Sequence, residues 1–286
     1  MYGGSPSGPV PTRLAAFAAG RDGPPPTPSG TQQEMDPQFY AAAIPAVIIL
    51  GLSKGGFVGL GNLAIPLMAL VMSPVQAAAV LLPILLVQDA VGVLSFRRSW
   101  DGFNLAVLLP SAFVGIFLGY LLAAHVSDAG IAFSVGVISI IFGLRRLIVE
   151  RRASGATALR PGIPFGLLCG VGAGFTSMIA HAGGPPFQIY VMPQRLPRDV
   201  LVGTSIIFFA AVNLVKVAPY FALGQFTREN LILSATLVPL AIVSTWAGVW
   251  LVRRISGERF YTLVYVLMVL VGLRLIWQSG PALFGA

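Results

Sequence analysis

An apolar stretch of the chain, 163–193, contains the sequence Ala180-His-Ala-Gly-Gly-Pro-Pro-Phe-Gln-Ile-Tyr190. A second apolar stretch, 38–72, contains Gly51-Leu-Ser-Lys-Gly-Gly-Phe-Val-Gly-Leu-Gly61 and then Pro66. Glycine allows backbone geometries that other residues avoid, and proline removes a hydrogen-bond donor and ends helices. Each stretch is therefore predicted to be a helix that breaks inside an apolar region. The breaking residues are Gly55, Gly56, Gly59, Gly61 and Pro66 in the first stretch, and Gly183, Gly184, Pro185 and Pro186 in the second.

The composition predicts an integral membrane protein. Of the 286 residues, 56% are hydrophobic and 10% are charged, whereas soluble domains carry about 25% charged residues. Long apolar runs indicate helices rather than a β-barrel. The net charge of +8 comes mostly from arginines in short loops, which is typical of membrane orientation and not of nucleic-acid binding. We expect the lipid bilayer as a partner and no nucleic acid.

Six unbroken segments are long and apolar enough to cross a bilayer. They are 75–96, 104–124, 129–149, 198–221, 230–252 and 258–278. Residues 1–36 are rich in Gly, Pro, Ser and Thr, so we expect a disordered tail without a signal peptide. The expected organisation is a first transmembrane repeat over 37–150, a basic cytoplasmic linker over 151–160, a second repeat over 161–278 and a tail over 279–286.

The two halves resemble each other in sequence. Ala106–Arg145 aligns without gaps to Ala235–Arg274 with eleven identities in forty positions, which indicates an internal repeat. If each broken stretch is one ordinary span, the halves are parallel. If each is a re-entrant hairpin beside three spanning helices, the halves are inverted.

The arginines favour inversion. Outside the N-terminal tail, twelve arginines lie on one face and two on the other in the inverted arrangement, against nine and five in the parallel one. Because short cytoplasmic loops are enriched in arginine, the fold class expected is an all-α, polytopic protein with two inverted repeats. Both termini are then outside the cytoplasm, and a bacterial inner membrane is the expected location.

Only two lysines occur, Lys54 and Lys216, and both lie in apolar segments. A cation inside a membrane costs roughly 2.5–3.5 kcal/mol on insertion scales, so it normally faces a cavity, a partner or a substrate. We interpret both as recognition elements for an anion. The alternatives are that Lys54 snorkels or pairs with a carboxylate, and that Lys216, late in its span, snorkels to the outer face.

Other polar groups in the spans extend this interpretation. His181 lies at the second break, where it binds the anion, takes a proton or only makes a structural hydrogen bond. Asp89 carries a coupling proton or neutralises a lysine, and Asn213 lies near its repeat-equivalent place. Candidate hydrogen-bond donors to an anion are Ser53, Asn62, Ser177, Gln188, Tyr190, Thr204 and Ser205. The single Cys169 and the spacing of the histidines give no metal signature, so no metal or cofactor is expected.

Two motifs resemble those of the sulfite exporter TauE/SafE family. They are Gly55-Gly-Phe-Val-Gly-Leu-Gly-Asn-Leu-Ala-Ile-Pro66 and Ala180-His-Ala-Gly-Gly-Pro-Pro-Phe-Gln-Ile-Tyr190, the latter followed by Gly203-Thr204, Asn213 and Lys216. The resemblance covers 37–278, and the second motif is the more specific. Members carry a further glycine run where this chain has Gly59-Leu-Gly61. The resemblance implies export of small sulfur-containing anions or related organic acids, such as sulfite or sulfoacetate.

The function expected is that of a secondary transporter, not an enzyme. It would bind a small anion near the membrane midplane and move it by alternating access, one repeat rocking against the other, with proton coupling through Asp89 or His181 as a possibility. An anion channel is the alternative, and a membrane-embedded enzyme is a further one. No ATP-binding motif is present. The sequence leaves the oligomeric state open.

Overall fold

The structure is a computed structural model, and it describes residues 37–54, 60–123, 127–149, 159–252 and 258–284. These residues form helices and their connections, with no strand among them. Six described helices are long and apolar enough to cross a membrane, and two shorter apolar helices accompany them. The prediction of an all-helical membrane protein is thereby confirmed.

The first half begins with α3 (Pro37–Lys54), whose described part ends at Lys54. The predicted breaking residues Gly55, Gly56 and Gly59 lie outside the described residues. The chain is described again in the 3-10 helix η1 (Leu60–Leu63), which includes Gly61, and the short helix α4 (Ala64–Met68), which includes Pro66. Three long helices follow: α5 (Pro74–Phe96), α6 (Gly102–Ala123) and α7 (Asp128–Val149).

The second half repeats this order, and its break is fully described. α8 (Ile163–Ala180) ends at His181, which takes the left-handed conformation with φ 49°. α9 (Gly184–Val191) begins after the three residues that follow the end of α8 and carries Pro185 and Pro186 in its first turn, where a missing N–H costs no helical hydrogen bond. The predicted break in 163–193 is therefore confirmed. The 3-10 helix η2 (Met192–Gln194), α10 (Arg198–Ala222), α11 (Arg228–Val252) and α12 (Glu258–Phe284) complete the chain.

The last helix continues beyond the sequence-based boundary. The prediction ends the final span at 278, but α12 runs to Phe284. Ser279 does not interrupt the helix because its hydroxyl donates to the Leu275 carbonyl at 2.6 Å, which satisfies the side chain within the helix. Residues 279–284 of the predicted tail are therefore helical.

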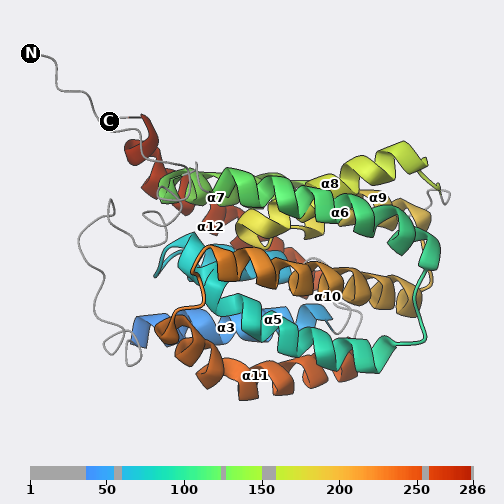
Figure 1. Cartoon of the computed structure of the whole chain (residues 1–286), viewed down its shortest axis with the longest axis horizontal. Helices are drawn as coiled ribbons and strands as arrows, with labels where there is room; N and C mark the ends of the chain where they lie inside the picture. Colours follow the sequence, from blue (N-terminus) through green and yellow to red (C-terminus); the bar gives the residue numbers. More distant parts are fainter. Residues whose placement is uncertain (1–36, 55–59, 124–126, 150–158, 253–257, 285–286) are drawn as a thin grey trace, which may run out of the picture.

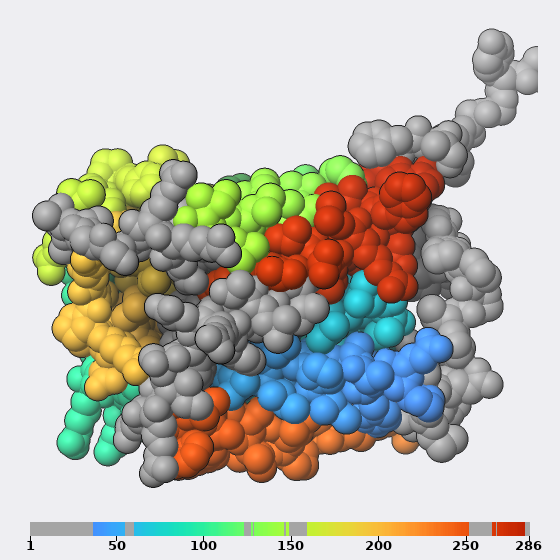
Figure 2. All heavy atoms as spheres, turned by 180° about the vertical axis from the view of Figure 1, so that it is seen from behind, coloured from blue at the N-terminus to red at the C-terminus, as the bar shows by residue number. Residues whose placement is uncertain are grey.

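The helices of the two halves pack on each other in matching pairs. α3 packs on α11 and α8 on α6, while α5 packs on α10 and α7 on α12. Figure 1 shows α5 and α10 side by side in the bundle and starting at opposite ends of it. α6 and α11 also start at opposite ends, but they lie on opposite sides of the bundle. From behind, α3 in blue lies directly against α11 in orange (Figure 2). In each of these pairs, one helix comes from the first half of the chain and the other from the second half.

Glycines allow two of these pairs to approach closely. A Cβ built on Gly174 of α8 would lie 1.9 Å from the Ala112 carbonyl oxygen of α6, and one on Gly248 of α11 would lie 2.6 Å from the Gly51 carbonyl oxygen of α3. Small residues at such positions let helices associate through van der Waals contact in a lipid environment. Any larger side chain there separates the helices.

We expect Gly174→Val to lower the midpoint of thermal unfolding in detergent and the yield of monodisperse protein. Overpacking of this kind costs about 1–3 kcal/mol or more. Gly280→Val in α12 is the control, because nothing lies within 4 Å of a Cβ built there. Equal unfolding midpoints for the two variants would contradict the close approach of α6 and α8.

Candidate functional site

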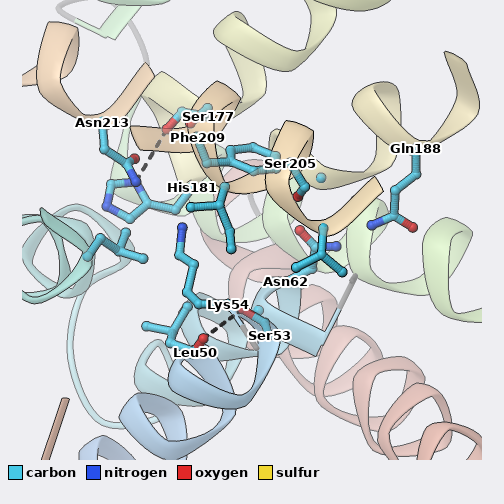
Figure 3. A pocket seen from close by; sticks show the side chains of 15 residues that line it. Leu50, Ser53, Lys54, Asn62, Ser177, His181, Gln188, Ser205, Phe209 and Asn213 are labelled. Atoms are coloured by element: carbon cyan, nitrogen blue, oxygen red, sulfur yellow. Dashed lines mark hydrogen bonds between the residues drawn. The ribbon is translucent and has the colours of Figure 1, made fainter. Parts of the chain in front are cut away.

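A cavity of about 70 Å³ lies beside the two breaks and between α3, α5 and α10. Its polar lining comes from both halves of the chain, and Figure 3 shows these side chains converging from several helices. Apolar side chains of α3, α5 and α10 close the rest of the wall. The lining residues are Leu50, Ser53, Lys54, Gly61, Asn62, Leu85, Ser177, His181, Gly184, Gln188, Val202, Ser205, Ile206, Phe209 and Asn213.

Lys54 belongs to a buried polar chain that joins three helices. Its ammonium group lies 2.5 Å from Asp89 Oδ1 of α5, and the Asn213 amide of α10 donates to Asp89 Oδ2 at 2.6 Å. All three side chains are buried. The carboxylate is thus satisfied on both oxygens, which is the condition under which a charge is tolerated in an apolar interior. The structural ion pair foreseen for Asp89 is present.

Lys54 also contacts an aromatic ring. Its ammonium nitrogen lies 5.6 Å from the centroid of the Phe209 ring, within the range of a cation–π interaction. The Phe209 ring in turn packs on Phe187 of α9 at 5.4 Å between centroids. Figure 3 shows Lys54 extending from the end of α3 toward His181 and Asn213. The snorkelling alternative for Lys54 is excluded, since the residue is 7% exposed.

His181 occupies the turn that ends α8. Its N–H donates to the Ser177 carbonyl, and the next N–H, that of Ala182, donates to the Thr176 carbonyl at 3.1 Å; together these bonds close the helix end. Glycine would adopt this left-handed conformation at lower cost. A side chain other than glycine is uncommon in this conformation, and such positions cluster at functional sites, which makes His181 a candidate for a functional role.

Lys216 lies behind His181, not in the cavity wall. Its side chain is 0% exposed, so snorkelling to an outer face does not occur. The ammonium group donates to the Ser177 carbonyl at 3.1 Å and lies 3.0 Å from His181 Nδ1. Tyr220, one turn further along α10, donates to the Met178 carbonyl at 3.2 Å. Lys216 therefore anchors α10 to the broken end of α8.

The two breaks meet at the cavity. A Cβ built on Gly184 would lie 2.5 Å from Asn62 Oδ1, so the absence of a side chain lets the Asn62 amide approach the start of α9. Pro185 and Pro186 have no N–H, and the Phe187 N–H is directed at the Gly183 carbonyl at 3.4 Å. The start of α9 therefore offers few backbone donors, fewer than a half-helix N-terminus normally presents. Side chains must supply most donors to a bound anion.

The structure brings most of the sequence-predicted site residues together. Ser53, Lys54, Asn62, Ser177, His181, Gln188, Ser205 and Asn213 line the cavity, and Asp89 adjoins it through its two hydrogen bonds. Tyr190 lies elsewhere, buried with its ring against Phe165 at 6.5 Å between centroids. Thr204 also lies elsewhere: its hydroxyl accepts from the Asp101 N–H at 2.8 Å, at the connection between α5 and α6.

Sequence reasoning missed Phe209 and the apolar wall. Val202, Ile206, Phe209 and Asn213 recur along α10 at intervals of three and four residues, which places them on one helical face. That spacing relative to Asn213 is the signal that identifies Phe209. Leu50 and Leu85 have a comparable spacing, since Leu50 lies three and four residues before Ser53 and Lys54, and Leu85 lies three and four residues before Gln88 and Asp89.

Comparison with known proteins agrees with this architecture. The family model described as sulfite exporter TauE/SafE matches residues 43–275 of the chain. Searches of curated proteins and of solved structures gave no match. The matched region spans both breaks and nearly all of the described helices. The chain therefore belongs to the sulfite exporter TauE/SafE family, whose members are membrane transporters of sulfite-type anions and not enzymes.

Proposed function

We propose that this protein is a secondary transporter that exports a small sulfur oxyanion, such as sulfite or sulfoacetate, or a related organic anion, by alternating access. The observation that carries the proposal is the cavity in which the cationic Lys54 and neutral hydrogen-bonding side chains from both halves converge beside the two breaks. Anions bind where charged and neutral donors replace their hydration shell. The cavity offers these groups inside an apolar bundle.

The size of the cavity favours a small anion. A water molecule requires roughly 10–15 Å³ by this measure, so about 70 Å³ accommodates a compact oxyanion or a few waters. The amides of Asn62, Gln188 and Asn213 and the hydroxyls of Ser53 and Ser205 surround this space. Lysine and neutral donors grip an oxyanion less specifically than a bidentate arginine, which suits a transporter that must release what it binds.

The charges near the cavity also favour an anion. Lys54 and Lys216 bring two positive charges and Asp89 brings one negative charge, so the protonated site has an excess of one positive charge. A buried excess charge is costly until it is compensated. A bound anion supplies that compensation, whereas a bound cation would add to the cost.

We assign the two halves, 37–150 and 161–278, to inverted repeats in a bacterial plasma membrane, with both termini on the non-cytoplasmic side. The opposite directions of α5 and α10 and the reciprocal pairs α3–α11 and α6–α8 support this assignment. Transporters with inverted repeats bind their substrates at the interface of the repeats, where broken helices meet. The cavity is lined by residues of both halves and lies beside the two breaks, which supports the assignment.

Lys54→Gln is expected to weaken anion uptake into proteoliposomes by about 10- to 100-fold, because a hydrogen bond to a charged group contributes roughly 1.5–3 kcal/mol. The assay uses radiolabelled or dye-reported sulfite, with thiosulfate, sulfoacetate and small carboxylates for comparison. Ser139→Ala is the control, since Ser139 is buried in α7 and its hydroxyl donates to the Val135 carbonyl. Unchanged uptake in Lys54→Gln would remove this lysine from the site.

Asp89→Asn is expected to destabilise the protein by about 3–5 kcal/mol, because it leaves the buried Lys54 charge without its counter-ion. The double variant Lys54→Gln/Asp89→Asn has no buried charge at this point and is expected to regain most of the lost unfolding temperature. Its anion uptake should stay low. Recovery of uptake together with stability would mean that the pair has only a structural role.

Reporters fused to each terminus test the inverted arrangement. A reporter that is active only outside the cytoplasm, such as alkaline phosphatase, is expected to be active at both ends of the chain. A fluorescent protein that folds only in the cytoplasm should be dark at both ends. Reversed signals at both termini would mean that both termini are cytoplasmic and would overturn the proposed orientation. Different signals at the two termini would mean that the chain crosses the membrane an odd number of times, which the inverted arrangement does not allow.

An anion channel is the alternative that the same cavity allows. Exchange distinguishes the two functions, because only a carrier accelerates the uptake of labelled anion when unlabelled anion is present on the opposite side. We expect such trans-acceleration for the preferred anion. Uptake that stays linear with concentration and indifferent to the opposite side would favour the channel.

A further inference from the structure

The two buried lysines differ in what balances their charge. Lys54 forms an ion pair with Asp89. Lys216 contacts only neutral groups, the Ser177 carbonyl and His181 Nδ1, and no described carboxylate forms an ion pair with it. Both ammonium groups are buried. The ion pair explains how Lys54 is tolerated at all times, whereas nothing comparable compensates Lys216 when the cavity is empty.

The charged and titratable groups around Lys216 come from each helix that packs on α10. α5 contributes Asp89, which already accepts from Lys54 and Asn213. α8 contributes His181 at its end, and Lys54 at the end of α3 is a second positive charge that acts on Lys216. Cys169 of α8 and Tyr120 of α6 are the remaining titratable residues of these two helices. α10 itself contributes Tyr220, whose hydroxyl donates to a carbonyl. The nearest mobile negative charge available to Lys216 is therefore an anion in the cavity.

We propose that Lys216 carries the coupling proton of the transporter, with His181 as the group that connects it to the cavity. The proposal rests on the function proposed above and concerns the same site. When an anion occupies the cavity, the protonated lysine is compensated. When the anion leaves, the ammonium group loses one proton and becomes a neutral amine. One proton thus crosses the membrane in the same direction as each anion.

His181 provides the path for this proton. Its ring lines the cavity, while Nδ1 faces the Lys216 ammonium group at 3.0 Å. In the release step a proton passes from Lys216 to Nδ1, and the imidazolium then returns to its neutral form by giving a proton to water. The balance is one ammonium converted to one amine with one proton released. Loading reverses these steps.

This assignment separates the roles of the two lysines. Lys54, held by Asp89, contacts the anion and keeps its charge throughout the cycle. Lys216, without a counter-ion, loses its charge once and regains it once in each cycle. Asp89 is engaged on both carboxylate oxygens, so the proton-relay role foreseen for it from sequence is better filled by the Lys216–His181 pair.

The test compares anion exchange with net anion transport in proteoliposomes that contain a trapped pH-sensitive dye. The probe is sulfite if the protein exchanges it, and otherwise the anion of the panel that is exchanged most rapidly. Net transport requires the empty carrier to change its orientation, but exchange does not. Lys216→Arg retains a positive charge at all working pH values. We expect its net transport to fall relative to its exchange by about a hundredfold, the factor that one uncompensated charge in a membrane implies.

Lys54→Arg is the matched control. Its guanidinium group can still pair with Asp89, so exchange and net transport are expected to change together and their ratio to stay near that of the wild type. Lys216→Gln is a second variant that cannot take up a proton. Any net anion movement that it retains is expected to occur without the dye response.

The wild-type protein keeps the test decisive even if the variants fold poorly. Net anion movement accompanied by a stoichiometric proton signal, with uphill accumulation driven by an imposed pH gradient, supports the proposal. Net anion movement in the wild type without any proton signal overturns it and leaves the transport function intact. Absence of exchange for every anion in the panel overturns the transport function itself. A normal proton signal in Lys216→Gln assigns coupling to another residue.

Discussion

The ion pair between Lys54 and Asp89 is the interaction on which the rest of this site depends. It joins α3 to α5 where the described part of α3 ends, and Asn213 extends it to α10. Neither charge is tolerable alone in an apolar bundle, because burial without a partner costs more than most single interactions supply. Together they fix three helices around one small space. Asp89 balances the charge of Lys54, and the charge of Lys216 has no such partner among the described residues.

The remaining polar groups fit around this fixed point. His181, in its left-handed turn, connects the cavity to Lys216, and Lys216 holds α10 to the broken end of α8. The Phe187, Phe208 and Phe209 rings pack α9 on α10, with centroids 4.9–5.4 Å apart. A rigid aromatic layer thus supports the second break, and the side chains that face the anion project from elements that the packing holds in place.

Much of this fold could be predicted from the sequence, since long apolar segments and glycine–proline breaks have direct physical consequences in a membrane. The helices α5, α6, α10 and α11 begin and end within a few residues of the predicted spans, and the break at His181–Gly184 is where the sequence places it. The pairing of helices could not be predicted. The sequence around Lys216 does not show whether its side chain reaches the surface or is buried against His181. The answer depends on the position of the end of α8 in the folded protein.

The site residues show the same division. Lys54, Asn62, His181 and Asn213 could be identified as polar residues in or next to apolar segments, a rare and costly arrangement. Phe209, Leu50 and Leu85 carry only an indirect signal, a spacing of three or four residues from a polar side chain, and it is the three-dimensional packing that places them on the cavity wall. Tyr190 and Thr204 matched the chemical criterion but point to other parts of the bundle. Composition selects candidates, and packing decides between them.

The close contact of Gly51 with Gly248 has a consequence for how the protein is made. α3 leaves the ribosome early, but its partner α11 is synthesised some 170 residues later. Until then the face of α3 that contains Gly51 lacks the helix against which it packs in the finished protein. α8, by contrast, finds α6 already inserted. The packing around α3 is therefore completed late in assembly, and the cavity is complete only after the second half has entered the membrane.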